Sequence, residues 1–160
     1  MSTTVERFAG GAIGEPGDRT FLLEFVVDGE PVSYLIEKLQ VAALAEEAQR
    51  LLRERGMIGA GLSLDPGEVH AESPLAFRVG GLQLSLEEGS ETAVLLIQST
   101  DEDDSPAQYE LSFAQLDAFA RDALVVVAGG RPPCPRCGLA MDAEGHNCPR
   151  TNGDLRSHRP

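Results

Sequence analysis

The sequence predicts an α+β fold in which two β-β-β-α units form the body and a small zinc-binding tail follows. Three observations lead to this prediction: a strand-to-helix pattern that occurs twice at one offset, a connection rich in Gly, Pro and acids, and the gathering of all three cysteines near the C-terminus. We expect a body over residues 1–128 with halves at about 1–56 and 75–128, a linker over 57–74, and a tail over 129–160.

The first unit contains a predicted hairpin and a predicted helix. Residues 19–27 and 32–37 are rich in β-branched, aromatic and other apolar side chains and flank the turn Asp28-Gly29-Glu30-Pro31. In the helix that follows, apolar side chains recur at spacings of three and four, and Gly56 stands where the helix would end. These apolar positions are Val41, Leu44, Ala45, Ala48, Leu51 and Leu52.

The second unit repeats this pattern 75 residues later. Tyr34 and Ile36 correspond to Tyr109 and Leu111, which again alternate with polar residues. The six apolar helix positions correspond to Leu116, Phe119, Ala120, Ala123, Val126 and Val127, and the pattern ends at Gly129-Gly130. Residues 82–86 and 92–98 supply the preceding strands. We therefore expect two antiparallel sheets, each covered by an amphipathic helix.

Two further segments resemble functional loops only superficially. The glycines of residues 9–17 invite comparison with a phosphate-binding loop, but a strand follows them where such a loop requires a helix. The acidic run at 101–106 lacks the glycine and the distal glutamate of a calcium-binding loop, so we expect an exposed hairpin loop. His70, in the linker beside Glu68 and Glu72, is expected to be a solvated histidine.

The charge distribution disfavours nucleic acid as a partner. Residues 1–128 carry 8 bases and 23 acids, a net charge of −15, whereas residues 129–160 carry 5 bases and 3 acids, a net charge of +2. A body this acidic repels phosphate backbones. The sequence has no secretory signal pattern and no apolar run of about 18 residues that could cross a membrane, and its odd number of cysteines suits a reducing compartment. We expect a cytoplasmic protein without a membrane association.

The cysteine-rich tail predicts a structural zinc site. Cys134 and Cys137 have the spacing of a zinc knuckle, with a glycine directly after the second cysteine. His146 and Cys148 follow, and in an extended segment side chains two residues apart face the same way. Apolar residues are sparse in the tail, so we expect the metal rather than a hydrophobic core to order it.

Other interpretations of the tail remain open. A disulfide between Cys134 and Cys137 would resemble a redox pair, although that motif normally opens a helix after a strand. A catalytic zinc with Glu144 as base, or an iron–sulfur cluster, could use the same ligands.

The tail also carries a family resemblance. The run CPRCGLAMDAEGHNCPRTNG, with GEPGDRTF near the start and the helix entry EKLQVAALAE, resembles an uncharacterised actinobacterial family of similar length. That family is catalogued as a conserved domain of unknown function, and the resemblance covers nearly the whole chain. Its most specific part is the pattern C-P-x-C-G-x3-D-x2-G-H-x-C-P-R-x-N-G. The resemblance implies a cytosolic protein in which the cysteine–histidine cluster is a family feature, and it implies no activity.

Three functions follow as hypotheses. The first is a non-enzymatic accessory or regulatory protein whose zinc-stabilised tail docks another protein, with Arg136, Arg150 and Asn152 as contacts. The second is a metal-dependent hydrolase or small-molecule binder with a cleft between the halves, lined by Arg7, Arg19 and His70. The third is a single-stranded nucleic-acid binder, similar in outline to the Pur-alpha and whirly proteins. A strand face lined with aromatics and arginines would favour it, and the acidic body argues against it.

Overall fold

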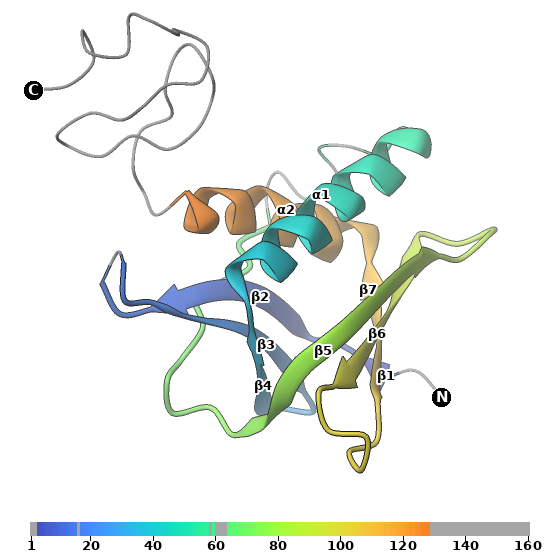
Figure 1. The fold of residues 1–160 in the computed structure, drawn as a ribbon. Helices are drawn as coiled ribbons and strands as arrows, with labels where there is room; N and C mark the ends of the chain where they lie inside the picture. The colour runs from blue at the N-terminus through green and yellow to red at the C-terminus, as the bar shows by residue number, and fades with distance from the viewer. Residues whose placement is uncertain (1–2, 16, 58, 60–63, 129–160) are drawn as a thin grey trace, which may run out of the picture. The chain divides into compact units, whose positions relative to one another are not determined.

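The computed structural model describes residues 3–15, 17–57, 59 and 64–128. Strands β2 to β4 and helix α1 form the first repeat, and strands β5 to β7 and helix α2 form the second (Figure 1). The bounds are β1 Thr3–Thr4, β2 Arg7–Ile13, β3 Thr20–Val27, β4 Glu30–Ile36, α1 Lys38–Glu54, β5 Leu75–Leu86, β6 Thr92–Ser99, β7 Ala107–Ser112 and α2 Phe113–Val127. The predicted α+β class is confirmed.

The strands form one mixed sheet, so the expectation of two antiparallel sheets was wrong. The strand order is β1-β7-β6-β5-β4-β3-β2. Each repeat is an antiparallel meander, but β4 and β5 pair in parallel, with Tyr34 opposite Phe77, and this pair joins the two meanders. A parallel pair requires a long crossover connection, which α1 and the linker provide.

A second parallel pair brings the two ends of the sheet together. Thr3 and Thr4 in β1 pair with Tyr109 and Glu110 in β7. Only Val5 and Glu6 separate β1 from β2, and the backbone N–H of Glu6 already donates to Val26 of β3. The segment from β1 to β2 therefore bridges from β7 to β3, as the single strand β5 bridges from β4 to β6. The sheet therefore curls, because its two edge strands, β1 and β2, are consecutive in the chain.

The two helix starts show how closely the repeats correspond. The backbone N–H of Glu37 donates to Gln40 Oε1 and that of Ser112 donates to Gln115 Oε1, in both cases at 2.9 Å. A capping box is therefore present at Ser112, and α1 has its equivalent. The same two glutamines also donate from Nε2 to backbone carbonyls far away in the sequence. Gln40 donates to Val79 in β5, and Gln115 donates to Val5, between β1 and β2.

The core lies between the curved sheet and the two helices, which occupy the same side of it (Figure 1). Aromatic rings form its centre. Phe8 stacks between Phe25 and Phe119, with ring centroids 4.7 and 4.3 Å apart, and Phe25 stacks on Tyr109 at 3.9 Å. Because strand side chains alternate between faces, β3 and β6 direct every second residue into this core.

Candidate functional site

The predicted zinc ligands and partner contacts lie outside the residues that the structure describes. These residues are Cys134, Cys137, His146 and Cys148, together with Arg136, Arg150 and Asn152. Within the described ranges, no group of three or more His, Cys, Asp or Glu side chains could hold a metal ion. In the same part of the chain, no helix has the length and apolar character needed to cross a membrane.

A buried carboxylate forms the most unusual polar site of the described body. Glu24 lies in the middle of β3, opposite Ala9 on β2 and Ser33 on β4, and its side chain is 0% exposed. It points to the outer face of the sheet, away from the aromatic core. The linker covers it there: Val69 packs against Gly11 of β2, and the backbone N–H of Ser33 donates to the Pro74 carbonyl at 2.8 Å.

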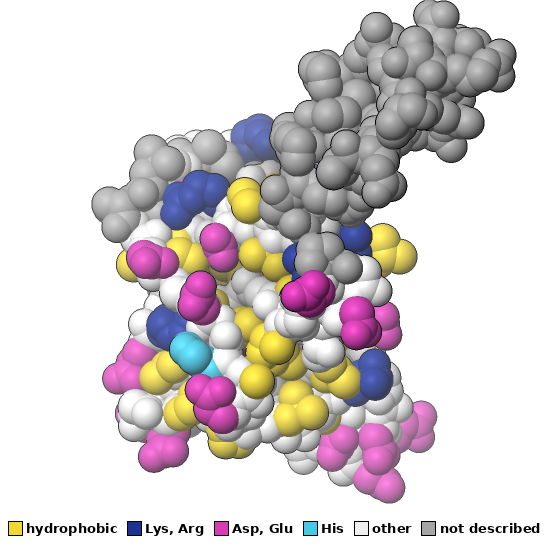
Figure 2. Space-filling model, turned by 90° about the vertical axis from the view of Figure 1, so that its left-hand side faces the viewer, with side chains coloured by type: hydrophobic (Ala, Val, Ile, Leu, Met, Phe, Trp, Pro, Cys, Tyr) yellow, Lys and Arg dark blue, Asp and Glu magenta, His cyan; other side chains and the backbone are white. Residues whose placement is uncertain are grey.

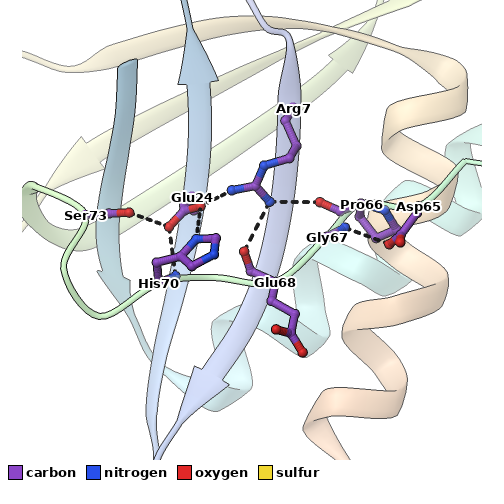
Figure 3. Close-up of polar contacts among 8 residues, drawn as sticks. All are labelled: Arg7, Glu24, Asp65, Pro66, Gly67, Glu68, His70 and Ser73. Carbon is purple, nitrogen blue, oxygen red and sulfur yellow. Dashed lines mark hydrogen bonds and ion pairs between the residues drawn. The ribbon is translucent and has the colours of Figure 1, made fainter. Parts of the chain in front are cut away.

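Among the described residues, four groups contact the Glu24 carboxylate (Figure 3). Oε1 accepts hydrogen bonds from the His70 backbone N–H at 2.9 Å and from the Ser73 hydroxyl at 2.5 Å. Oε2 contacts the guanidinium of Arg7 and lies 3.1 Å from His70 Nδ1. Three of the four groups belong to the linker, so Glu24 fastens the linker to the sheet.

Arg7 strengthens the same attachment from the neighbouring strand. While one end of its guanidinium pairs with Glu24, its NH1 group donates to the carbonyls of Pro66 and Glu68, at 2.9 and 3.2 Å. Arg7 therefore holds the first part of the described linker and Glu24 holds the second part. We call Arg7, Glu24, His70 and Ser73 the linker clasp.

The surroundings keep Glu24 ionised. Burial by itself raises the pKa of the Glu24 carboxyl, but hydrogen bonds from Ser73 and His70 and the positive charge of Arg7 outweigh burial, and the net pKa lies below its ordinary value. An ionised carboxylate only accepts hydrogen bonds, so His70 Nδ1 must carry the hydrogen in this contact. With two donors on each oxygen, Glu24 has little capacity left to act as a base on a substrate.

A hollow of about 440 Å³ opens beside the clasp. Arg7, Glu24, His70 and Ser73 line it together with Val26, Gly29, Pro31 and Glu72. The structure thus brings Arg7 and His70 together, as the cleft hypothesis requires, but within the first repeat and the linker and not between the halves. Arg19 is not among the lining residues, and its guanidinium lies 4.9 Å from the Phe21 ring centroid.

A second group of carboxylates lies where the linker approaches α2. Burial raises the pKa of Asp122, and the nearby carboxylates of Asp65 and Glu68 raise it further, while Arg121 partly opposes them. Arg121 also donates to the Leu64 carbonyl at 3.1 Å. Figure 2 shows acidic side chains distributed over the face that carries the histidine, with apolar side chains between them.

The aromatic side chains give no platform for stacking nucleic-acid bases. The chain has six phenylalanines, two tyrosines and no tryptophan, and all eight aromatic residues fall in described segments. Seven are buried, and the eighth, Phe77, is partly buried against Tyr34. Base stacking needs exposed rings, so this surface disfavours the single-strand hypothesis.

Glu24 and Ser73 were not singled out from the sequence. One signal was present, because Glu24 is the only charged residue in the apolar run Phe21 to Val27. A carboxylate in a strand that is apolar on both faces indicates a buried, hydrogen-bonded acid. Ser73 gave no such signal, since a serine in a polar loop is ordinary.

Comparison with known proteins identifies a family without a known activity. A family model described as "Protein of unknown function (DUF3090)" matches residues 2–148. No significant match was found among curated proteins or among solved structures.

Proposed function

Because the chain belongs to the family of proteins of unknown function DUF3090, we propose a role for it that rests on its own residues: a cytosolic, zinc-binding accessory or regulatory protein that acts by binding another protein. In this proposal the body is a non-enzymatic scaffold and the tail is the docking element. Cys134, Cys137, His146 and Cys148 bind one structural zinc ion.

The observation that carries the non-enzymatic part is the saturation of Glu24. A working general base needs a lone pair directed at the proton it removes. Both Glu24 oxygens are instead occupied by donors from the linker and from Arg7. The most deeply buried acid of the described body thus has a structural task, which suits a scaffold.

The zinc part is supported by ligand chemistry and by the extent of the family match. Three thiolates and one imidazole form a common tetrahedral zinc set. The match to the family ends at residue 148, which is the last of the four proposed ligands, so the cysteine–histidine cluster lies inside the matched region. Zinc in sites of this kind contributes roughly 10–16 kcal/mol at neutral pH, enough to order a short segment with few apolar residues.

The first experiment measures zinc in protein purified without chelators. We expect one zinc per chain in the wild type, loss of zinc in Cys137→Ser, and retention in Met141→Leu, a matched change between the proposed ligands. Thermal unfolding of the body should stay the same in all three proteins. Wild-type protein that is free of zinc, or zinc retained in Cys137→Ser, contradicts the proposal.

The second experiment tests the partner. A protein co-purified from the native extract is produced separately, and its binding is measured by calorimetry with the wild type, the Cys137→Ser variant and an Arg136→Ala/Arg150→Ala double variant. Binding should be lost without zinc and weakened about tenfold or more without the two arginines, since charge-assisted contacts commonly contribute that much. Equal affinity for all three proteins excludes the tail as the docking element.

A further inference from the structure

The hollow beside the linker clasp presents a hydrogen-bond acceptor, Nε2 of His70, when the imidazole is neutral. The ionised Glu24 carboxylate accepts from His70 Nδ1, so in the neutral imidazole the hydrogen is on Nδ1 and Nε2 keeps its lone pair. The His70 ring lines the hollow, and its side chain is 52% exposed, so a ligand can reach it. Figure 3 shows the Nδ1 edge of the ring turned toward Glu24, which leaves the Nε2 edge on the other side.

The electrostatics of the hollow favour a cation. Arg7 and Glu24 form an ion pair and offset each other, so the carboxylate of Glu72 leaves the lining with excess negative charge. At the rim, Glu6 Oε1 accepts a hydrogen bond from the Gly29 N–H at 2.8 Å, and Asp28 and Glu30 flank that glycine in the chain. A cavity lined by one sign of charge concentrates ligands of the opposite sign.

The hollow also offers apolar contact. Val26 and Pro31 are partly exposed and belong to its lining. Its volume of about 440 Å³ lies in the usual range for small-ligand sites, roughly 300–1,000 Å³. An apolar wall next to an acceptor and a carboxylate suits a molecule with a short aliphatic stem and a charged nitrogen head.

We propose that this hollow binds an alkylguanidinium or alkylammonium group. The charged head donates to His70 Nε2 and to the Glu72 carboxylate, and the stem lies against Val26 and Pro31. The ligand is either a free small amine or the arginine or lysine side chain of a protein. The site is built from the body and the linker alone, so it does not depend on zinc or on the tail.

The test uses three probes with the full-length protein: agmatine as a free alkylguanidine, N-acetyl-arginine methylamide as a peptide-embedded one, and N-acetyl-citrulline methylamide as the neutral analogue of the second. Binding is followed by amide and imidazole NMR shifts. We expect saturable shifts at His70 and Gly29 with both guanidines, and roughly tenfold weaker binding of citrulline. Because agmatine carries a second positive charge, an affinity of the arginine derivative within about tenfold of agmatine indicates a protein side chain, and a larger preference for agmatine indicates a free ligand.

Two variants separate binding from folding. In His70→Asn, the amide can replace the Nδ1–H donor to Glu24 while the Nε2 acceptor is lost, so agmatine affinity should fall about tenfold with little change in melting temperature. Glu72→Gln, at an exposed site outside the clasp, should weaken agmatine several-fold, and Glu88→Gln in the β5–β6 loop should have no effect. Shifts that map elsewhere, equal binding of citrulline, or unchanged affinity in both His70→Asn and Glu72→Gln would overturn the proposal.

Discussion

The hydroxyl oxygens of Tyr34 and Tyr109 lie 2.5 Å apart, and the two tyrosines occupy equivalent positions in the two repeats, 75 residues apart in the sequence. Each lies in the last strand of its repeat, where that strand forms a parallel pair: Tyr34 is opposite Phe77 of β5, and Tyr109 is opposite Thr3 of β1. Both side chains are buried. The hydrogen bond therefore joins the two repeats through equivalent residues, one from each repeat.

Replacing one of the two tyrosines by phenylalanine should lower the free energy of unfolding by more than the net contribution of one hydrogen bond. In Tyr34→Phe or Tyr109→Phe the remaining hydroxyl loses its partner in the core, at a cost of about 1–3 kcal/mol in the free energy of unfolding. The double variant removes both hydroxyls and should be less destabilised than the sum of the singles. Urea unfolding followed by circular dichroism measures this. Additive single effects would show that the two hydroxyls are not coupled.

The same pair should make the protein sensitive to alkali. Burial raises the pKa of Tyr34, as does its hydrogen bond with Tyr109, and burial likewise raises the pKa of Tyr109 above its usual value although its bond with Tyr34 opposes this. A raised pKa in the folded state means that stability is complete below the unfolded pKa of about 10 and falls as the pH rises above it. Unfolding free energies between pH 8 and 11 should therefore decline, and should decline less in the Tyr34→Phe/Tyr109→Phe variant. Parallel pH profiles would contradict this.

The linker clasp predicts a large effect of Glu24→Gln. The variant keeps the shape of the side chain but removes its charge. It also places the NH2 group of the amide against hydrogen-bond donors that the carboxylate oxygens accept from. We expect a loss of about 2–4 kcal/mol in unfolding free energy. The exposed Glu88→Gln, as a matched control, should change stability by less than about 0.5 kcal/mol. Limited proteolysis should show faster cleavage of the linker in Glu24→Gln. Wild-type cleavage rates would mean that the clasp does not hold the linker.

Acid should release the same clasp. Because the folded-state pKa of Glu24 is lowered, its contribution to stability is present above the unfolded pKa of about 4.3 and is lost as the pH falls toward the folded pKa. Other carboxylates also titrate in this range, so the informative quantity is the difference in melting temperature between wild type and Glu24→Gln. This difference should shrink from pH 7 to pH 3, and a constant difference would exclude a contribution from the Glu24 charge.

The duplicated organisation could be predicted from the sequence because it rests on local periodicity. The alternation at Tyr34 and Ile36 and at Tyr109 and Leu111 predicts that these side chains lie in the core, and all four are buried. Strand and helix periods depend on neighbouring residues only, and the common offset of 75 reinforced them.

The joint between the repeats and the clasp could not be predicted in the same way. Which strands pair in parallel depends on the path of the linker, and no local pattern encodes that path. Glu24 lies 17 residues from Arg7 and 46 residues from His70 in the sequence. Glu24 in an apolar strand indicated a buried acid, but nothing nearby in the sequence identified its partners. The proposed zinc ligands lie outside the described residues, so the tail stays a prediction from spacing.

Close packing between β2 and α2 gives a last prediction. A methyl group at Gly10 would lie 2.5 Å from Cε1 of Phe119, whose ring is fully buried and stacked on Phe8. Gly10→Ala should therefore cost about 1–3 kcal/mol through overpacking, although alanine is otherwise the better strand residue. Phe119→Leu removes the ring atoms that the new methyl group would contact, so Gly10→Ala should cost clearly less in the Phe119→Leu protein than in the wild type. The control Ser85→Ala, at an exposed position, should be nearly neutral in both proteins. If urea unfolding gives the same cost of Gly10→Ala with and without the Phe119 ring, the contact does not set the requirement for glycine at this position.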